Sequence, residues 1–101
     1  MQLLGKVTAG SKTADTDLFT DIPSPASANK GGFVLIFVNV GAAAKVKFTK
    51  DGTNYYEANS GTALTADVAF STLIPVADDD VLNFQVDTTV QVDEFQVFYY
   101  D

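Results

Sequence analysis

The chain has 101 residues, 47% hydrophobic and 19% charged, with no cysteine, histidine or tryptophan and with lysine as its only basic residue type. This composition predicts one globular domain over residues 1–101, and it excludes disulfides, thiolate or imidazole metal sites and serine–histidine catalysis. A net charge of −7 argues against nucleic acid and against anionic membranes as partners, because both require basic surface. We therefore expect a protein that is not an enzyme and has no cofactor.

The charge is unevenly distributed along the sequence. Residues 1–50 contain all six lysines and have a net charge of +3, whereas residues 51–101 contain ten acids and no base. Two interpretations are open. Either strands from both halves interleave and the asymmetry disappears in space, or the folded protein is bipolar and meets a copy of itself or a neighbour by charge complementarity.

No segment has the pattern of a targeting signal. The first seven residues, MQLLGKV, place no basic region before a long apolar run, so we expect no secretory signal peptide. The longest apolar run, residues 33–38, is too short to cross a bilayer. The expected location is therefore one reached without crossing a membrane.

The first third of the chain predicts two strands separated by a long loop. Residues 3–9 and 32–40 have the composition of strands. Residues 11–31 contain two prolines and a run of serine and alanine without a regular period, which is typical of a loop, with one short strand near residues 18–22.

The most regular alternation lies in a predicted hairpin. Ala44, Val46 and Phe48 alternate with polar residues, as on a strand with one wet face. The dipeptide Asp51-Gly52 follows and supplies the positive backbone angle of a tight turn. Residues 54–58 then form the returning strand.

Three further strands are predicted in the C-terminal part. They cover residues 68–75, residues 82–87 and, after a turn at Thr88-Thr89, a last strand that contains Val90, Val92, Phe95, Val97 and Tyr99. In the last strand the apolar residues change from even to odd positions near residues 93–94. A β-bulge at these residues would absorb this one-residue slip.

The resulting fold class is all-β. Seven or eight short strands separated by turn residues predict a single antiparallel β-sandwich, jelly-roll-like, with an Ig-like sandwich as the alternative.

The apolar run at residues 33–38 is the first candidate binding surface. It is apolar on both faces of the strand, although one wall of a sandwich needs only one apolar face. Either a loop such as residues 11–31 covers the second face, or that face is a subunit interface. On the second interpretation the interface includes Phe33, Leu35 and Phe37.

The C-terminal strand raises the same question. If Phe95, Val97 and Tyr99 point inward, then Phe98 and Tyr100 point outward near the chain end, where they are candidates for contact with another chain. The alternative is stacking on Tyr55 or Tyr56 at the sandwich surface.

A sugar or calcium site is the competing interpretation of the surface residues. Tyr55 and Tyr56 are candidate ligand-binding residues of a carbohydrate-binding or adhesion module. Asp78, Asp79 and Asp80 form a triple carboxylate that calcium would stabilise, and a second acidic group lies at residues 15–21. Neither group has the ligand spacing of an EF-hand, so we expect solvated acidic turns and no metal.

Two segments resemble parts of small bacteriophage virion proteins. Residues 45–55, KVKFTKDGTNY, combine a strand, an Asp-Gly turn and an aromatic strand in a way that recurs in those proteins. Residues 73–84, LIPVADDDVLNF, are similar to a Pro-x-Gly-Asp turn that enters a strand of the same kind of sandwich, with aspartate here in the place of glycine.

The resemblance implies a capsid decoration, or cement, protein. Such a protein is made in the host cytoplasm, resides on the virion, binds the major capsid protein and is often a trimer. This implication agrees with the homo-oligomer and with the absence of catalytic residues expected from the composition.

Overall fold

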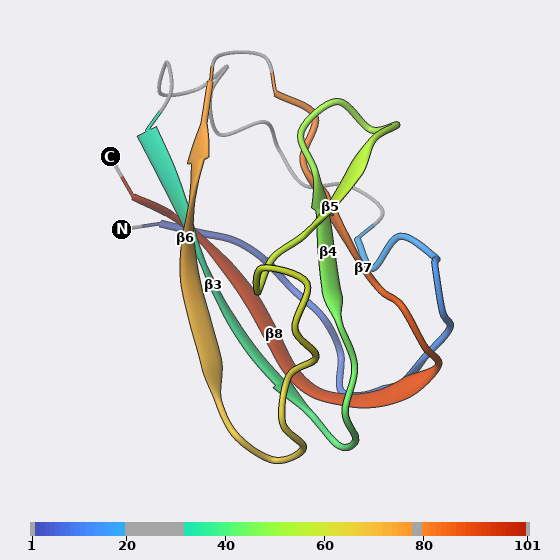
Figure 1. Cartoon of the computed structure of the whole chain (residues 1–101). Coiled ribbons are helices and arrows are strands. Elements are labelled where there is room, and N and C mark those ends of the chain that lie inside the picture. Colours follow the sequence, from blue (N-terminus) through green and yellow to red (C-terminus); the bar gives the residue numbers. More distant parts are fainter. Residues whose placement is uncertain (1, 20–31, 78–79, 101) are drawn as a thin grey trace.

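The computed structural model describes residues 2–19, 32–77 and 80–100 and contains eight strands in two antiparallel sheets (Figure 1). The larger sheet has the order β1-β8-β3-β6, with β2 also paired to β8, and the smaller sheet has the order β5-β4-β7. The strands are β1 (Gln2–Lys6), β2 (Gly10–Lys12), β3 (Gly32–Val40), β4 (Val46–Thr49), β5 (Tyr55–Glu57), β6 (Phe70–Val76), β7 (Asn83–Val86) and β8 (Val90–Tyr100). The predicted all-β, antiparallel, sandwich-like architecture with seven or eight strands is confirmed.

Most of the predicted strands occur, with shifted ends. The predicted bounds of β3 are those of the structure, the predicted last strand is β8, and β4 and β5 form the predicted hairpin, in which Gly52 has a φ of 78°. The strand predicted over residues 3–9 ends at Lys6, although the N–H of Val7 still donates to the carbonyl of Phe95 at 3.0 Å.

The prediction of an uninterrupted loop from residue 11 was wrong at its start. Residues 10–12 form β2, which pairs with Val90–Val92 of β8. Its three residues, Gly-Ser-Lys, are too few and too polar to give an alternating signal. Phe19, within the short strand predicted near residues 18–22, is not in a strand, and the rest of that region from residue 20 onward lies outside the described residues.

The predicted bulge is present in β8. Asn39 of β3 pairs with Glu94 and the next residue, Val40, pairs with Val92, so Asp93 is the additional residue. The bulge brings the even residues Val90 and Val92 and the odd residues Phe95 and beyond onto the same inner face.

A cluster of aromatic rings fills the space between the sheets. Phe84 of β7 and Phe95 of β8 are fully buried with ring centroids 5.2 Å apart, and Phe19 contacts both rings edge-on at 5.9 and 5.7 Å. The side chain of Asn83 holds Phe19 in place, because its Nδ2 donates to the Phe19 carbonyl at 2.8 Å and its Oδ1 accepts from the Phe19 N–H at 3.2 Å. The segment after β2 therefore contributes directly to the core.

The turn at Thr88-Thr89 changes sheets. It joins β7 of the smaller sheet to β8 of the larger sheet, and these two strands do not pair with each other. Because the chain crosses between the layers at this point, the rings of Phe84 and Phe95 meet across the core, tilted by 54° to each other.

Replacing a central ring should remove much of the stability. We expect Phe95→Ala to lower the free energy of unfolding by about 3–5 kcal/mol, because it removes a fully buried ring and leaves a cavity between two other rings. Urea unfolding followed by circular dichroism measures the loss. The matched variant Phe33→Ala, at a half-exposed ring of the larger sheet, should cost less than half as much, and equal losses would contradict this description of the core.

Candidate functional site: the outer face of the larger sheet

The larger sheet has apolar side chains on the side that faces away from the core. Along β3 the even-numbered residues from Val34 to Val40 are buried, and the odd-numbered residues point the other way. Phe33 and Phe37 are exposed, and Leu35 between them is half-buried. The sequence left open which face of residues 33–38 points outward, and the structure places Phe33, Leu35 and Phe37 on the side away from the core. Their role in an interface remains a prediction.

The strand register aligns these residues with apolar neighbours in rows. The first row crosses β1, β8, β3 and β6, because Leu3 pairs with Phe98, Phe98 with Leu35, and Leu35 with Leu73. In the second row Phe33 lies between Tyr100 and Pro75, and in the third row Phe37 lies between Gln96 and Ser71. We call the apolar members of these three rows the outer face; they are Leu3, Phe33, Leu35, Phe37, Leu73, Pro75, Phe98 and Tyr100.

The C-terminal aromatic residues belong to this face. Phe95, Val97 and Tyr99 are buried as predicted, and Phe98 and Tyr100 point outward. Phe98 meets Phe37 edge-on, with ring centroids 5.8 Å apart. The alternative of stacking on Tyr55 or Tyr56 is wrong for Phe98, because both tyrosines belong to β5 of the other sheet.

The predicted cover for this face is not found over residues 11–19. Residues 11 and 12 belong to β2 and pair with β8. Residues 15–18 run along the edge of β7 in the smaller sheet, where the N–H of Asp15 donates to the carbonyl of Val86 and the N–H of Leu18 to the carbonyl of Phe84, both at 2.8 Å. The remainder of the loop lies outside the described residues.

The two tyrosines proposed as a ligand platform point to opposite faces of β5. Tyr56 packs against Phe48, with ring centroids 5.9 Å apart, and is half-exposed. The hydroxyl of Tyr55 instead donates to the carboxylate of Asp17, which also accepts from Gln85 at 2.9 Å. Loss of water contact and this carboxylate raise the pKa of Tyr55 to about 12. The two rings therefore do not form one flat surface for a sugar.

The lysines and acids of the smaller sheet neutralise one another in part. Lys47 pairs with Asp15, and Lys45 lies 3.6 Å from Glu57. The second pair joins the basic and acidic halves of the sequence, which supports the interleaved interpretation of the charge asymmetry at this place.

The acidic turns offer no metal site within residues 2–19, 32–77 and 80–100. No group of three or more potential ligand side chains occurs there. Asp80 accepts a hydrogen bond from the N–H of Ala77 at 2.8 Å, and Asp78 and Asp79 lie outside the described residues. The alternative of a calcium site at residues 78–80 therefore stays a prediction.

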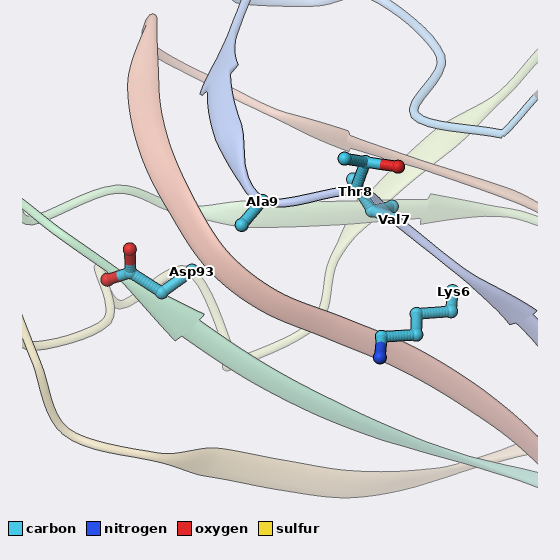
Figure 2. Close-up of a pocket in the computed structure, with 5 residues that line it drawn as sticks. All are labelled: Lys6, Val7, Thr8, Ala9 and Asp93. Carbon is cyan, nitrogen blue, oxygen red and sulfur yellow. The ribbon is translucent and has the colours of Figure 1, made fainter.

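A shallow hollow lies at the interruption between β1 and β2. Figure 2 shows Lys6 and Asp93 at separate ends of this hollow of about 400 Å³, with Val7, Thr8 and Ala9 between β1 and β2. No ion pair joins Lys6 to Asp93.

Three members of the outer face, Leu3, Leu73 and Pro75, were not among the residues singled out in the sequence. Leu3 and Leu73 lie in short predicted strands of unknown pairing, and only the register shows that they extend the row of Leu35 and Phe98 to both edges of the sheet. Pairing between distant strands is not encoded in local alternation.

Comparisons with known proteins add no family. No protein-family model matches this chain, and no curated protein matches it. In the part of the chain that the structure describes, no helix is long and apolar enough to cross a membrane.

The turn of the β4–β5 hairpin is held by the carboxylate of Asp51. Oδ1 of Asp51 accepts from the hydroxyl of Thr49 at 3.0 Å and from the N–H groups of Thr53 and Asn54 at 2.8 and 2.7 Å. The Asn54 side chain donates to Oδ2 at 2.7 Å. These hydrogen bonds hold the pKa of Asp51 well below its usual range, and the bond from the backbone N–H of Asn54 has the largest effect. They also explain why Thr49, predicted on the wet face, is fully buried with its hydroxyl satisfied.

Acid should remove the contribution of Asp51 to stability. Because its pKa is lowered by folding, the stabilisation is complete above the unfolded pKa of about 4 and is lost as the pH falls below it. We expect Asp51→Ala to lower the midpoint of urea unfolding at pH 7, and the difference from the natural chain to shrink below about pH 4. The control Asp93→Ala removes an acid that accepts one hydrogen bond, from Gln91 at 3.3 Å, and should change the midpoint of unfolding little. A difference between Asp51→Ala and the natural chain that stays constant with pH would contradict this role of Asp51.

Proposed function

We propose that this chain is a non-enzymatic structural protein of a viral particle, a capsid decoration protein or a comparable virion surface component. It acts by surface contact, as a homo-oligomer docked on the major capsid protein. The observation that carries the proposal is the outer face, in which one apolar row crosses β1, β8, β3 and β6 and two shorter rows flank it.

The outer face has no role in closing the core. The side chains between the sheets already supply that core, including the fully buried Ile36, Phe84 and Phe95. The largest exposed apolar patch of a monomeric protein is often functional. A surface that binds other protein subunits accounts for this second apolar face, whereas a hydrolytic or metal-dependent activity does not.

The strand order supports a jelly-roll-like topology over the Ig-like alternative. The pairs are nested along the chain, since β1 pairs with β8, β3 with β6 and β4 with β5. Residues 15–18, which follow β2, hydrogen-bond to β7. This contact adds one more nested pair, inside the pair β1–β8 and outside the pair β3–β6. Jelly rolls with two Greek keys are common in viral capsid proteins and also in lectins.

Co-sedimentation with particles tests the virion role. Purified chain is mixed with particles assembled from the major capsid protein of the same genome, and we expect saturable retention in the particle fraction. The control is the same chain mixed with particles of an unrelated capsid protein. The proposal is wrong if the genome encodes no capsid protein or if the chain stays in the supernatant.

A glycan array separates the proposal from the carbohydrate-binding alternative. The opposite directions of Tyr55 and Tyr56 favour no binding, with or without a chelator of calcium. A saturable hit that disappears in Tyr56→Ala would support the alternative. If the glycan binding also disappears when a chelator is added, the chain would be a calcium-assisted carbohydrate-binding module.

A further inference from the structure

We infer that the outer face is closed by a second copy of this chain, with the two larger sheets packed face to face about a two-fold axis. This inference rests on the proposed structural role and names the partner of its surface. It differs from the trimer that the sequence resemblance implies, because a two-fold contact produces dimers or assemblies of dimers.

The area of the outer face fits a stable homodimer. Five of its side chains are 38–53% exposed, namely Leu3, Phe33, Phe37, Leu73 and Tyr100. At about 200 Å² for each free side chain, they leave on the order of 500 Å² of apolar surface. A standard interface buries about 800 Å² per partner, and about 65% of a homodimer interface is apolar, which is again roughly 500 Å².

Only one such patch exists in the described part of the chain. The other half-exposed large apolar residues lie on three separate elements: Tyr56 on β5, Val68 in the loop before β6 and Val81 before β7. A ring of subunits needs two different patches that complement each other, whereas a two-fold contact needs one patch that meets itself. The single outer face therefore favours the two-fold contact.

The charges around the patch permit this contact. None of the three rows that define the outer face contains an acid, although the whole chain has a net charge of −7. Lys6 pairs with Gln96 at the border of the third row, and Glu94 lies one row beyond it. A polar rim with charges of both signs around an apolar centre is the usual anatomy of a protein–protein interface.

The centre of the patch is already ordered. Phe37 and Phe98 are in edge-to-face contact, so their rings lose little rotational freedom when a partner covers them. Rigid aromatic side chains at the middle of an interface are the residues on which binding most often depends.

Sedimentation equilibrium of the full chain tests the inference. Between about 1 and 200 µM, the range in which moderate affinities are resolved, we expect the mass to rise from that of a 10.8 kDa monomer to twice that value. The double variant Phe33→Lys with Leu73→Lys should weaken association at least about 100-fold, because it buries unpaired charges in the contact. Circular dichroism checks that the fold is retained.

A matched control uses equally exposed residues away from the outer face. Tyr56→Lys with Val81→Lys changes two side chains that are 55% and 58% exposed, and should leave the association constant within about twofold. Because the natural chain has no cysteine, Leu35→Cys and Val81→Cys each carry one thiol. A short bis-maleimide should link two copies of the first variant and not of the second, because Leu35 lies at the centre of the face.

The outcomes separate this inference from the virion role. A monomer at all concentrations, a trimer, or equal weakening by the control variant would overturn the two-fold contact. If such a monomer still binds particles and the lysine variant at Phe33 and Leu73 does not, the capsid protein occupies the outer face and the virion role stands. A dimer that binds no particle supports the two-fold contact and contradicts the virion role.

Discussion

The structure depends on the alternation of side chains along two neighbouring strands, β3 and β8, which carry apolar residues on both of their faces. In β3 one set of residues, Val34 to Val40, forms the wall of the core, and the intervening residues must then point away from it. The same holds for β8 after its bulge, where Phe95 points inward and Phe98 outward. Because β3 and β8 are neighbours in register, their outward residues combine into one surface. Two apolar faces on one sheet are thus a direct consequence of the sequence.

Local signals in the sequence were sufficient for the strongest elements. The ends of β3, the Asp51-Gly52 turn and the bulge at Asp93 were all predictable, because each depends on a few adjacent residues. The change from even to odd apolar positions in β8 could be explained only by an additional residue. The outward direction of Phe98 and Tyr100 followed from that step, so these two members of the candidate site were also predictable.

Contacts between distant parts of the chain could not be predicted in the same way. Nothing in the sequence indicates that Leu3 and Leu73, seventy residues apart, lie at the two ends of one row. The bond from Tyr55 to Asp17 was equally hidden, and it removes one of the two rings from the predicted ligand platform. Both depend on which strands become neighbours, and the entropy of closing such long loops is compensated only by the folded structure as a whole.

The separation of charge from apolar surface gives the molecule two different sides. On the smaller sheet Lys45 and Lys47 pair with acids, and the hairpin turn is closed by the carboxylate of Asp51. On the larger sheet the outer face has no acid in its rows. At physiological ionic strength charges interact over only about 8 Å, so repulsion between two copies depends on the charges near the contact and not on the total of −7. An acidic chain can therefore remain soluble through one side while the other packs against a second copy.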